Sequence, residues 1–179
     1  MSGAKRRRKN AIGSAFIAHK KEMRESFAWR YLPDNARRIL DRLELEHLRH
    51  GGADNGFLKC TYSDFEEAGI RRASVALAIR QCVELGFAEI TGQGQRSVSS
   101  FRAPSLYRLT YLNGWGRSMP PTDDWQRVTS DESAVAALTR ASAARNFATQ
   151  PVRSAVGCGV EIQNSGRANV PTQGALARP

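Results

Sequence analysis

Apolar residues recur at helical spacing in the middle of the chain. The first such stretch begins after Pro33 and ends near Leu48, just before a pair of glycines. Its apolar stripe consists of Ala36, Ile39, Leu40, Leu43 and Leu48. Charged residues lie mostly off this stripe, and Asp34 or Asn35 can cap the first turn. The pattern predicts an amphipathic helix that packs on a core.

A brief strand and a short helix are predicted next. The run 57–60 has room for a brief strand only. The capping-box pattern then occurs twice, as Thr61 with Asp64 and as Ser63 with Glu66. In a capping box the two side chains bond to each other's backbone N–H groups, so either pair predicts the start of a helix. This helix is barely two turns long, because a glycine follows closely.

A third helix is predicted after a tight turn. It runs from Arg72 or Ala73 through Leu85, and Gly86 ends it. Its inward-facing positions are Val75, Ile79 and Cys82, flanked by Ala78 and Leu85. Spacings of four and three residues place these side chains on one face of a helix. This helix is therefore expected to pack on the same core and to expose its opposite face.

The residues after the third helix predict a pair of antiparallel strands. The run 87–91 predicts a strand, 92–97 a flexible basic loop, and the alternating pattern at 106–111 the partner strand. Together these elements indicate one α+β, mainly helical domain at residues 26–112. Scattered apolar residues in the segment 16–29 predict that this segment packs on the domain.

Three stretches of the chain resemble a known protein family. They are 61–72 (TYSDFEEAGIRR), 78–87 (AIRQCVELGF) and 105–110 (SLYRLT). In sequence and in the order of elements they are similar to winged helix-turn-helix proteins of bacterial, phage and plasmid type, which include replication initiators and transcriptional regulators. The resemblance covers about half the chain. It implies three helices plus a small antiparallel β wing, and sequence-specific binding of double-stranded DNA.

The segments on either side of this domain predict less structure. Residues 1–25 are expected to form a basic, mostly flexible arm, and residues 113–179 a low-complexity tail that is largely disordered. Within the tail, Thr129 and Glu132 form a capping-box pattern and alanine is abundant, so 129–147 is a candidate helix. We expect this helix to dock weakly, because it has no clear apolar stripe.

The charge of the chain favours polyanionic partners. The formal net charge is +10 and the isoelectric point is near 10.3. Nucleic acid, an anionic membrane surface and an acidic protein all suit this charge. The excess lies in residues 1–25, which contain eight Lys or Arg and two Glu. Because neither a secretory signal nor a run of about 20 apolar residues is found, we expect a cytoplasmic, nucleoid-associated protein without membrane contact.

The exposed face of the third helix supplies candidate DNA contacts. A helix about 18 Å long fits the major groove with its first turn toward the base edges, where arginine can pair with guanine. The predicted DNA-binding residues are Arg71, Arg72, Ser74, Leu77, Arg80 and Gln81 on the helix, Arg96 and Arg102 on the wing, and Lys5, Arg6, Arg7, Arg8 and Lys9 in the arm. For any single arginine the alternative is a solvated surface charge.

Some alternatives stay open at the level of the sequence. Leu77 is apolar on an otherwise polar face, and it either contacts a thymine methyl group or packs beneath the segment 16–29. Together with the acidic Glu66 and Glu67, an exposed Leu77 also fits a winged-helix module in which the third helix binds a protein instead of DNA. A homodimer is a further alternative, and the sequence does not distinguish replication from transcription.

The sequence holds no catalytic motif. It lacks the phosphate-binding GxxxxGK and the metal-binding HExxH patterns. Cys60, Cys82 and Cys158 are far apart, and the first two fall at inward-facing positions where cysteine acts as a small apolar side chain. His47 and His50 are spaced like metal ligands, but no third ligand is evident. We therefore predict a protein that is not an enzyme, with no cofactor, metal or evident small-molecule ligand.

Overall fold

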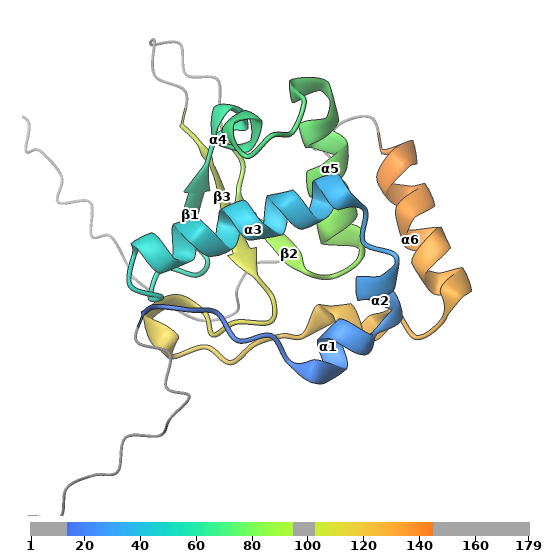
Figure 1. Cartoon of the computed structure of the whole chain (residues 1–179), viewed down its shortest axis with the longest axis horizontal. Coiled ribbons are helices and arrows are strands. Elements are labelled where there is room, and N and C mark those ends of the chain that lie inside the picture. The colour runs from blue at the N-terminus through green and yellow to red at the C-terminus, as the bar shows by residue number, and fades with distance from the viewer. Residues whose placement is uncertain (1–13, 95–102, 145–179) are drawn as a thin grey trace, which may run out of the picture.

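The computed structural model describes residues 14–94 and 103–144 (Figure 1). Within these ranges the chain has six α-helices, two 3-10 helices and one three-stranded antiparallel sheet. In chain order the elements are α1 (Lys21–Glu25), α2 (Phe27–Arg30), α3 (Asp34–Arg49), β1 (Leu58–Cys60), α4 (Tyr62–Glu67), α5 (Arg72–Glu84), β2 (Ala88–Gly92), β3 (Ser105–Leu109), η1 (Trp115–Arg117), η2 (Asp124–Arg127) and α6 (Asp131–Ala143). The prediction of an α+β, mainly helical chain is confirmed. The predicted disorder of residues 1–13 and 145–179 lies outside the described residues. The prediction that 113–128 are disordered is wrong, because η1 and η2 form there and Trp125 is buried in the core.

The three helices predicted for the middle of the chain are confirmed close to their predicted bounds, as α3, α4 and α5. The buried face of α3 includes Ala36, Ile39, Leu40 and Leu43. Its N-cap is Pro33, so neither Asp34 nor Asn35 caps it. α4 begins with the predicted capping box of Thr61 and Asp64. The local start signal therefore predicted the beginning of α4 well, because a capping box acts within a single turn.

The sheet has the order β1-β3-β2, with β3 in the centre. Tyr107 of β3 pairs with Leu58 of β1 on one side and with Ile90 of β2 on the other. Tyr107 and Leu109 point to the same face of the sheet, as alternate residues of a strand do, and both are buried. The predicted antiparallel pairing of the two strands after α5 is confirmed.

The segment before α3 packs on the core, as predicted. Met23 of α1 and Ala28 of α2 are fully buried. The ring of Trp29 meets that of Phe87 edge-on, with 5.5 Å between the centroids. The prediction that all of 1–25 is a mostly flexible arm is therefore wrong for α1. One buried methionine in a single short helix gives too weak a pattern to predict the helix itself, although the segment 16–29 was expected to pack on the domain.

α6 lies alongside α5 (Figure 1) and packs closely on it. Its buried residues are Ala134, Ala137 and Ala141. Small side chains let two helices approach closely, so a helix without large apolar residues can still be well packed. The prediction of weak docking is thus wrong. The helix predicted at 129–147 is shorter, and its capping box is formed by Ser130 and Ser133.

The packed unit extends past β3 to the end of α6, beyond the predicted range 26–112. Trp125 and Val128 are buried in the same apolar cluster as the other helices. Gly86 ends α5 with a φ of +81°, and a Cβ at this position would come within 2.5 Å of the carbonyl carbon of Asp124. Glycine suits both the backbone conformation and the close approach of the η2 segment.

Candidate nucleic-acid interface

The start of α4 is fixed to α3 by the Asp64 carboxylate. It accepts a hydrogen bond from the Thr61 N–H at 2.7 Å and another from Arg42 Nη2 at 2.8 Å. Burial by itself raises the pKa of Asp64, but these bonds outweigh it and hold the pKa below its usual value. Arg42 is buried and also bonds Glu46 at 2.9 Å. α4 therefore has a well-defined position on α3.

The chain reverses direction between α4 and α5 within a few residues. Gly69 adopts a φ of +84°, and its N–H donates to the Glu66 carbonyl at 2.9 Å. The Ile70 N–H donates to the Phe65 carbonyl at 3.1 Å, and the Ile70 side chain is buried. Arg38 of α3 donates to the Gly69 carbonyl at 3.0 Å. These bonds determine where α5 begins.

Arg71 and Arg72 are exposed at this beginning, as the sequence predicted. Arg71 is the N-cap of α5 and Arg72 is its first residue. Arg72 Nη1 donates to Glu66 Oε2 at 2.6 Å, and its guanidinium carbon lies 5.8 Å from the centre of the Tyr62 ring. The side-chain charges add to the partial positive charge of the helix N-terminus, so this surface favours an anion.

Three other predicted residues of α5 line one shallow hollow of about 440 Å³. They are Ser74, Leu77 and Gln81. The opposite wall is formed by the start of α3, including Arg38, and not by the segment 16–29. The half-buried Leu77 therefore faces a hollow between α3 and α5.

Arg80 points toward α6. Its Nε donates to the Ala141 carbonyl at 2.7 Å, and Arg140 Nε donates to Glu84 Oε2 at 2.8 Å nearby. This geometry argues against Arg80 as a DNA contact. The sequence placed Arg80 on the exposed face of α5 because α6 was expected to dock weakly.

Sequence reasoning missed Arg38 as part of this surface. The available signal was its position off the apolar stripe of α3, which Arg37 shares. Arg37, however, donates to the carbonyls of Leu32 and Trp29 at 3.1 and 3.0 Å. Which of the two arginines reaches the α4–α5 turn depends on how α3 crosses the other helices, and local patterns do not give that angle.

Seven predicted DNA-binding residues lie outside the described residues. They are Lys5, Arg6, Arg7, Arg8 and Lys9 of the arm and Arg96 and Arg102 between β2 and β3. Their roles stay predictions.

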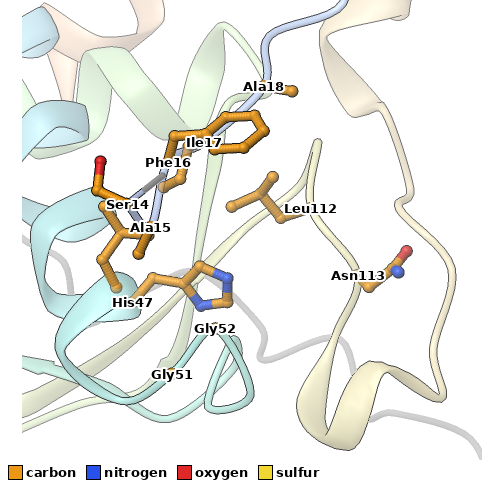
Figure 2. A pocket seen from close by; sticks show the side chains of 11 residues that line it. Ser14, Ala15, Phe16, Ile17, Ala18, His47, Gly51, Gly52, Leu112 and Asn113 are labelled. Carbon is orange, nitrogen blue, oxygen red and sulfur yellow. The ribbon is translucent and has the colours of Figure 1, made fainter. Parts of the chain in front are cut away.

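Another hollow, of about 460 Å³, lies at the C-terminal end of α3. Figure 2 shows Phe16 and His47 close to it, with Leu112 and Asn113 across from them. Its lining is mainly apolar, and His47 is the one titratable side chain among the lining residues. It therefore lacks a second group for acid–base chemistry.

The two described cysteines are buried, as predicted. Burial raises the pKa of Cys60 to about 12 and also raises that of Cys82, so both are protonated thiols of low reactivity. His50 Nε2 lies 3.2 Å from Glu46 Oε1. In the part of the chain that the structure describes, no three His, Cys, Asp or Glu side chains come together as a metal site.

Comparison of the chain with models of protein families, with curated proteins and with solved structures found no significant match. None of the helices within 14–94 and 103–144 has both the length and the apolar character needed to cross a bilayer. Function is therefore inferred from the geometry of the α4–α5 end.

Proposed function

We propose that the chain is a winged helix-turn-helix protein that binds double-stranded DNA in a sequence-specific way. In this proposal α4 and α5 are the helix-turn-helix, α5 is the recognition helix, and β2 and β3 carry the wing. The order of elements, the tight turn at Gly69 and the sheet order β1-β3-β2 support it. The observation that carries it is the exposure of Arg71 and Arg72 together on the first turn of α5.

The proposed recognition helix enters the major groove by its first turns. The groove is about 12 Å wide, and one helix with its side chains is about 10 to 12 Å across. Axes of packed helices are about 8 to 10 Å apart, so α5 and α6 side by side are wider than the groove. Arg80 and Glu84, which bond to α6, lie in the C-terminal half of α5. The N-terminal end of α5, with Arg71, Arg72 and Ser74, is therefore the part that can enter the groove.

Each side chain at this end has a suitable contact. A guanidinium can donate two parallel hydrogen bonds to O6 and N7 of guanine, and a serine hydroxyl can bond to either a base or a phosphate. Arg38, beside the turn, suits a phosphate at the edge of the groove. Arg96 and Arg102 of the wing are proposed to contact the DNA backbone or the minor groove.

The basic run Lys5 to Lys9 is proposed to bind phosphates without sequence preference. Such binding releases counterions, so it weakens steeply as salt increases. Removal of residues 1–10 then weakens binding to every duplex alike. The cellular role proposed is that of a replication-initiation or accessory factor of a plasmid- or phage-type element, or of a transcriptional regulator, acting on the nucleoid in the cytoplasm.

Selection from a library of random duplexes tests this function. We expect one motif to be enriched over several rounds. A palindromic motif indicates a homodimer, and direct repeats indicate an origin of replication. Absence of binding at micromolar protein in about 50 mM salt contradicts the proposal, because low salt favours contacts to phosphates.

The hollow around Leu77 favours a second candidate, a winged-helix module that binds a protein through α5. An apolar side chain of the partner would enter the hollow between α3 and α5. In that case Leu77→Asp abolishes binding of the partner, and the selection enriches no motif.

A further inference from the structure

Arg71 and Arg72 are neighbours in the sequence, but their side chains are held differently. Arg72 is bonded to Glu66 and lies over the ring of Tyr62. Among residues 14–94 and 103–144, no hydrogen bond or ion pair involves the Arg71 side chain. One arginine is thus oriented before any ligand arrives, and the other keeps its rotamer freedom.

We infer that Glu66 and Tyr62 position Arg72 to read a guanine, whereas Arg71 binds a phosphate. This inference rests on the proposed function and assigns a role to each arginine. A guanidinium has five N–H donors in one plane. Glu66 engages Nη1, and the flat ring of Tyr62 restricts the plane of the group, while the remaining N–H groups stay free to pair with O6 and N7 of a guanine.

The contact between Arg72 and Glu66 does little for folding. The two side chains are 60% and 37% exposed, and ion pairs at such exposure contribute little to stability. Its consequence lies in binding, since a side chain that is already oriented loses less freedom when it meets a base. The freer Arg71 suits phosphate oxygens, which fix the register of the protein on DNA but carry no sequence information.

Glu66→Ala and Glu67→Ala are a matched pair for testing this. Glu67 is the exposed neighbour of Glu66 on α4. Each variant removes one negative charge, so both should raise affinity for random duplex by a similar factor. The affinity of each variant is measured for the selected site and for the same site with 7-deazaguanine, which lacks the N7 acceptor, at each guanine in turn.

For the wild-type protein we expect one guanine at which 7-deazaguanine weakens binding. Glu66→Ala and Arg72→Ala should lose about threefold or more of this discrimination, because a bidentate pair carries it. Glu67→Ala and Arg71→Ala should keep it. Tyr62→Phe keeps the ring and should behave like the wild-type protein, whereas Tyr62→Leu should lose part of the discrimination.

Several results overturn the inference. The inference is wrong if Glu66→Ala and Glu67→Ala discriminate equally between guanine and 7-deazaguanine. It is also wrong if Arg71→Ala loses this discrimination and Arg72→Ala keeps it.

The folding of the variants is checked by their thermal midpoints, which should agree for Glu66→Ala and Glu67→Ala. Glu66→Gln, which has the same size as the wild-type residue, serves if Glu66→Ala fails to fold. A wild-type protein that binds no duplex contradicts the proposed function. If the wild-type protein binds the selected site but Glu66→Ala keeps its full discrimination, only the role of Glu66 in positioning Arg72 is contradicted.

Discussion

At the scale of single residues, Asn55 joins the loop before β1 to the end of β3. The two N–H groups of its Nδ2 are shared among the carbonyls of Leu109, Leu112 and Asn113, at 2.8, 3.2 and 2.9 Å. Its Oδ1 accepts from the Leu109 N–H at 2.7 Å. The side chain is 1% exposed, so water cannot replace these bonds. Asn55 therefore fixes the end of the central strand.

Asn55→Ala should lower the free energy of unfolding by about 2 to 3 kcal/mol, because the Leu109 N–H and buried carbonyls lose their partner. Urea unfolding followed by circular dichroism measures this. Asn55→Asp keeps the size but turns a carboxylate toward three carbonyls, so it should be at least as unstable at neutral pH. A loss below about 0.5 kcal/mol in both variants contradicts the role given to Asn55.

The lowered pKa of Asp64 makes the stability of the fold depend on pH. Burial raises the pKa of its carboxyl, but the hydrogen bonds from Thr61 and Arg42 lower it by more than burial raises it. The pKa of Asp64 is therefore lower in the folded state than in the unfolded state. The unfolded state then takes up the proton first as pH falls. The contribution of Asp64 is complete above about pH 5 and is lost as pH falls through the folded pKa.

Asp64→Asn should therefore be less stable than the wild-type protein at pH 7, and the difference should shrink as pH falls below about 4. Urea midpoints measured across this range check the sign. A difference that grows on acidification contradicts it.

At the scale of elements, α5 packs against both α3 and α6, but the sequence predicted only which face of α5 meets the core. The stripe Val75, Ile79 and Cys82 marks the face of α5 that meets the core, and these residues are buried. The contact with α6 relies on alanines, whose spacing gives little signal in an alanine-rich segment. Arg80 was misplaced for the same reason, because its surroundings depend on a helix distant in the sequence.

The contact between α5 and α6 can be tested with two neighbouring alanines. Ala137 is fully buried and Ala136 is exposed. Ala137→Leu should lower the free energy of unfolding by about 1 to 3 kcal/mol, because added methylene groups do not fit a close helix contact. Ala136→Leu should change it by less than about 0.5 kcal/mol. Equal unfolding midpoints of the two variants would mean that α6 is not packed as described.

At the scale of the whole molecule, part of the candidate DNA surface could be predicted from the sequence. Arg71 and Arg72 were placed correctly on the exposed first turn of α5, because glycine and a capping box define where that turn lies. Arg38 and the hollow around Leu77 arise from the packing of α3 against α5, so they became visible only in three dimensions. The net charge of +10 did not help to locate this surface, because most of the excess precedes residue 26.

The most direct test compares three proteins by fluorescence anisotropy, on the selected site and on random duplex. They are the wild-type protein, Arg71→Ala/Arg72→Ala and a control, Arg49→Ala/Arg127→Ala. The control removes the same charge from arginines that are 63% and 54% exposed and, like Arg72, paired with an acidic residue. We predict that Arg71→Ala/Arg72→Ala has the same affinity for the selected site and for random duplex, whereas the control keeps the wild-type preference for the selected site. Two results would contradict the assignment of α5 as the recognition helix. One is that Arg71→Ala/Arg72→Ala loses affinity for both duplexes by the same factor, so that the preference survives; the other is that the control loses the preference as well.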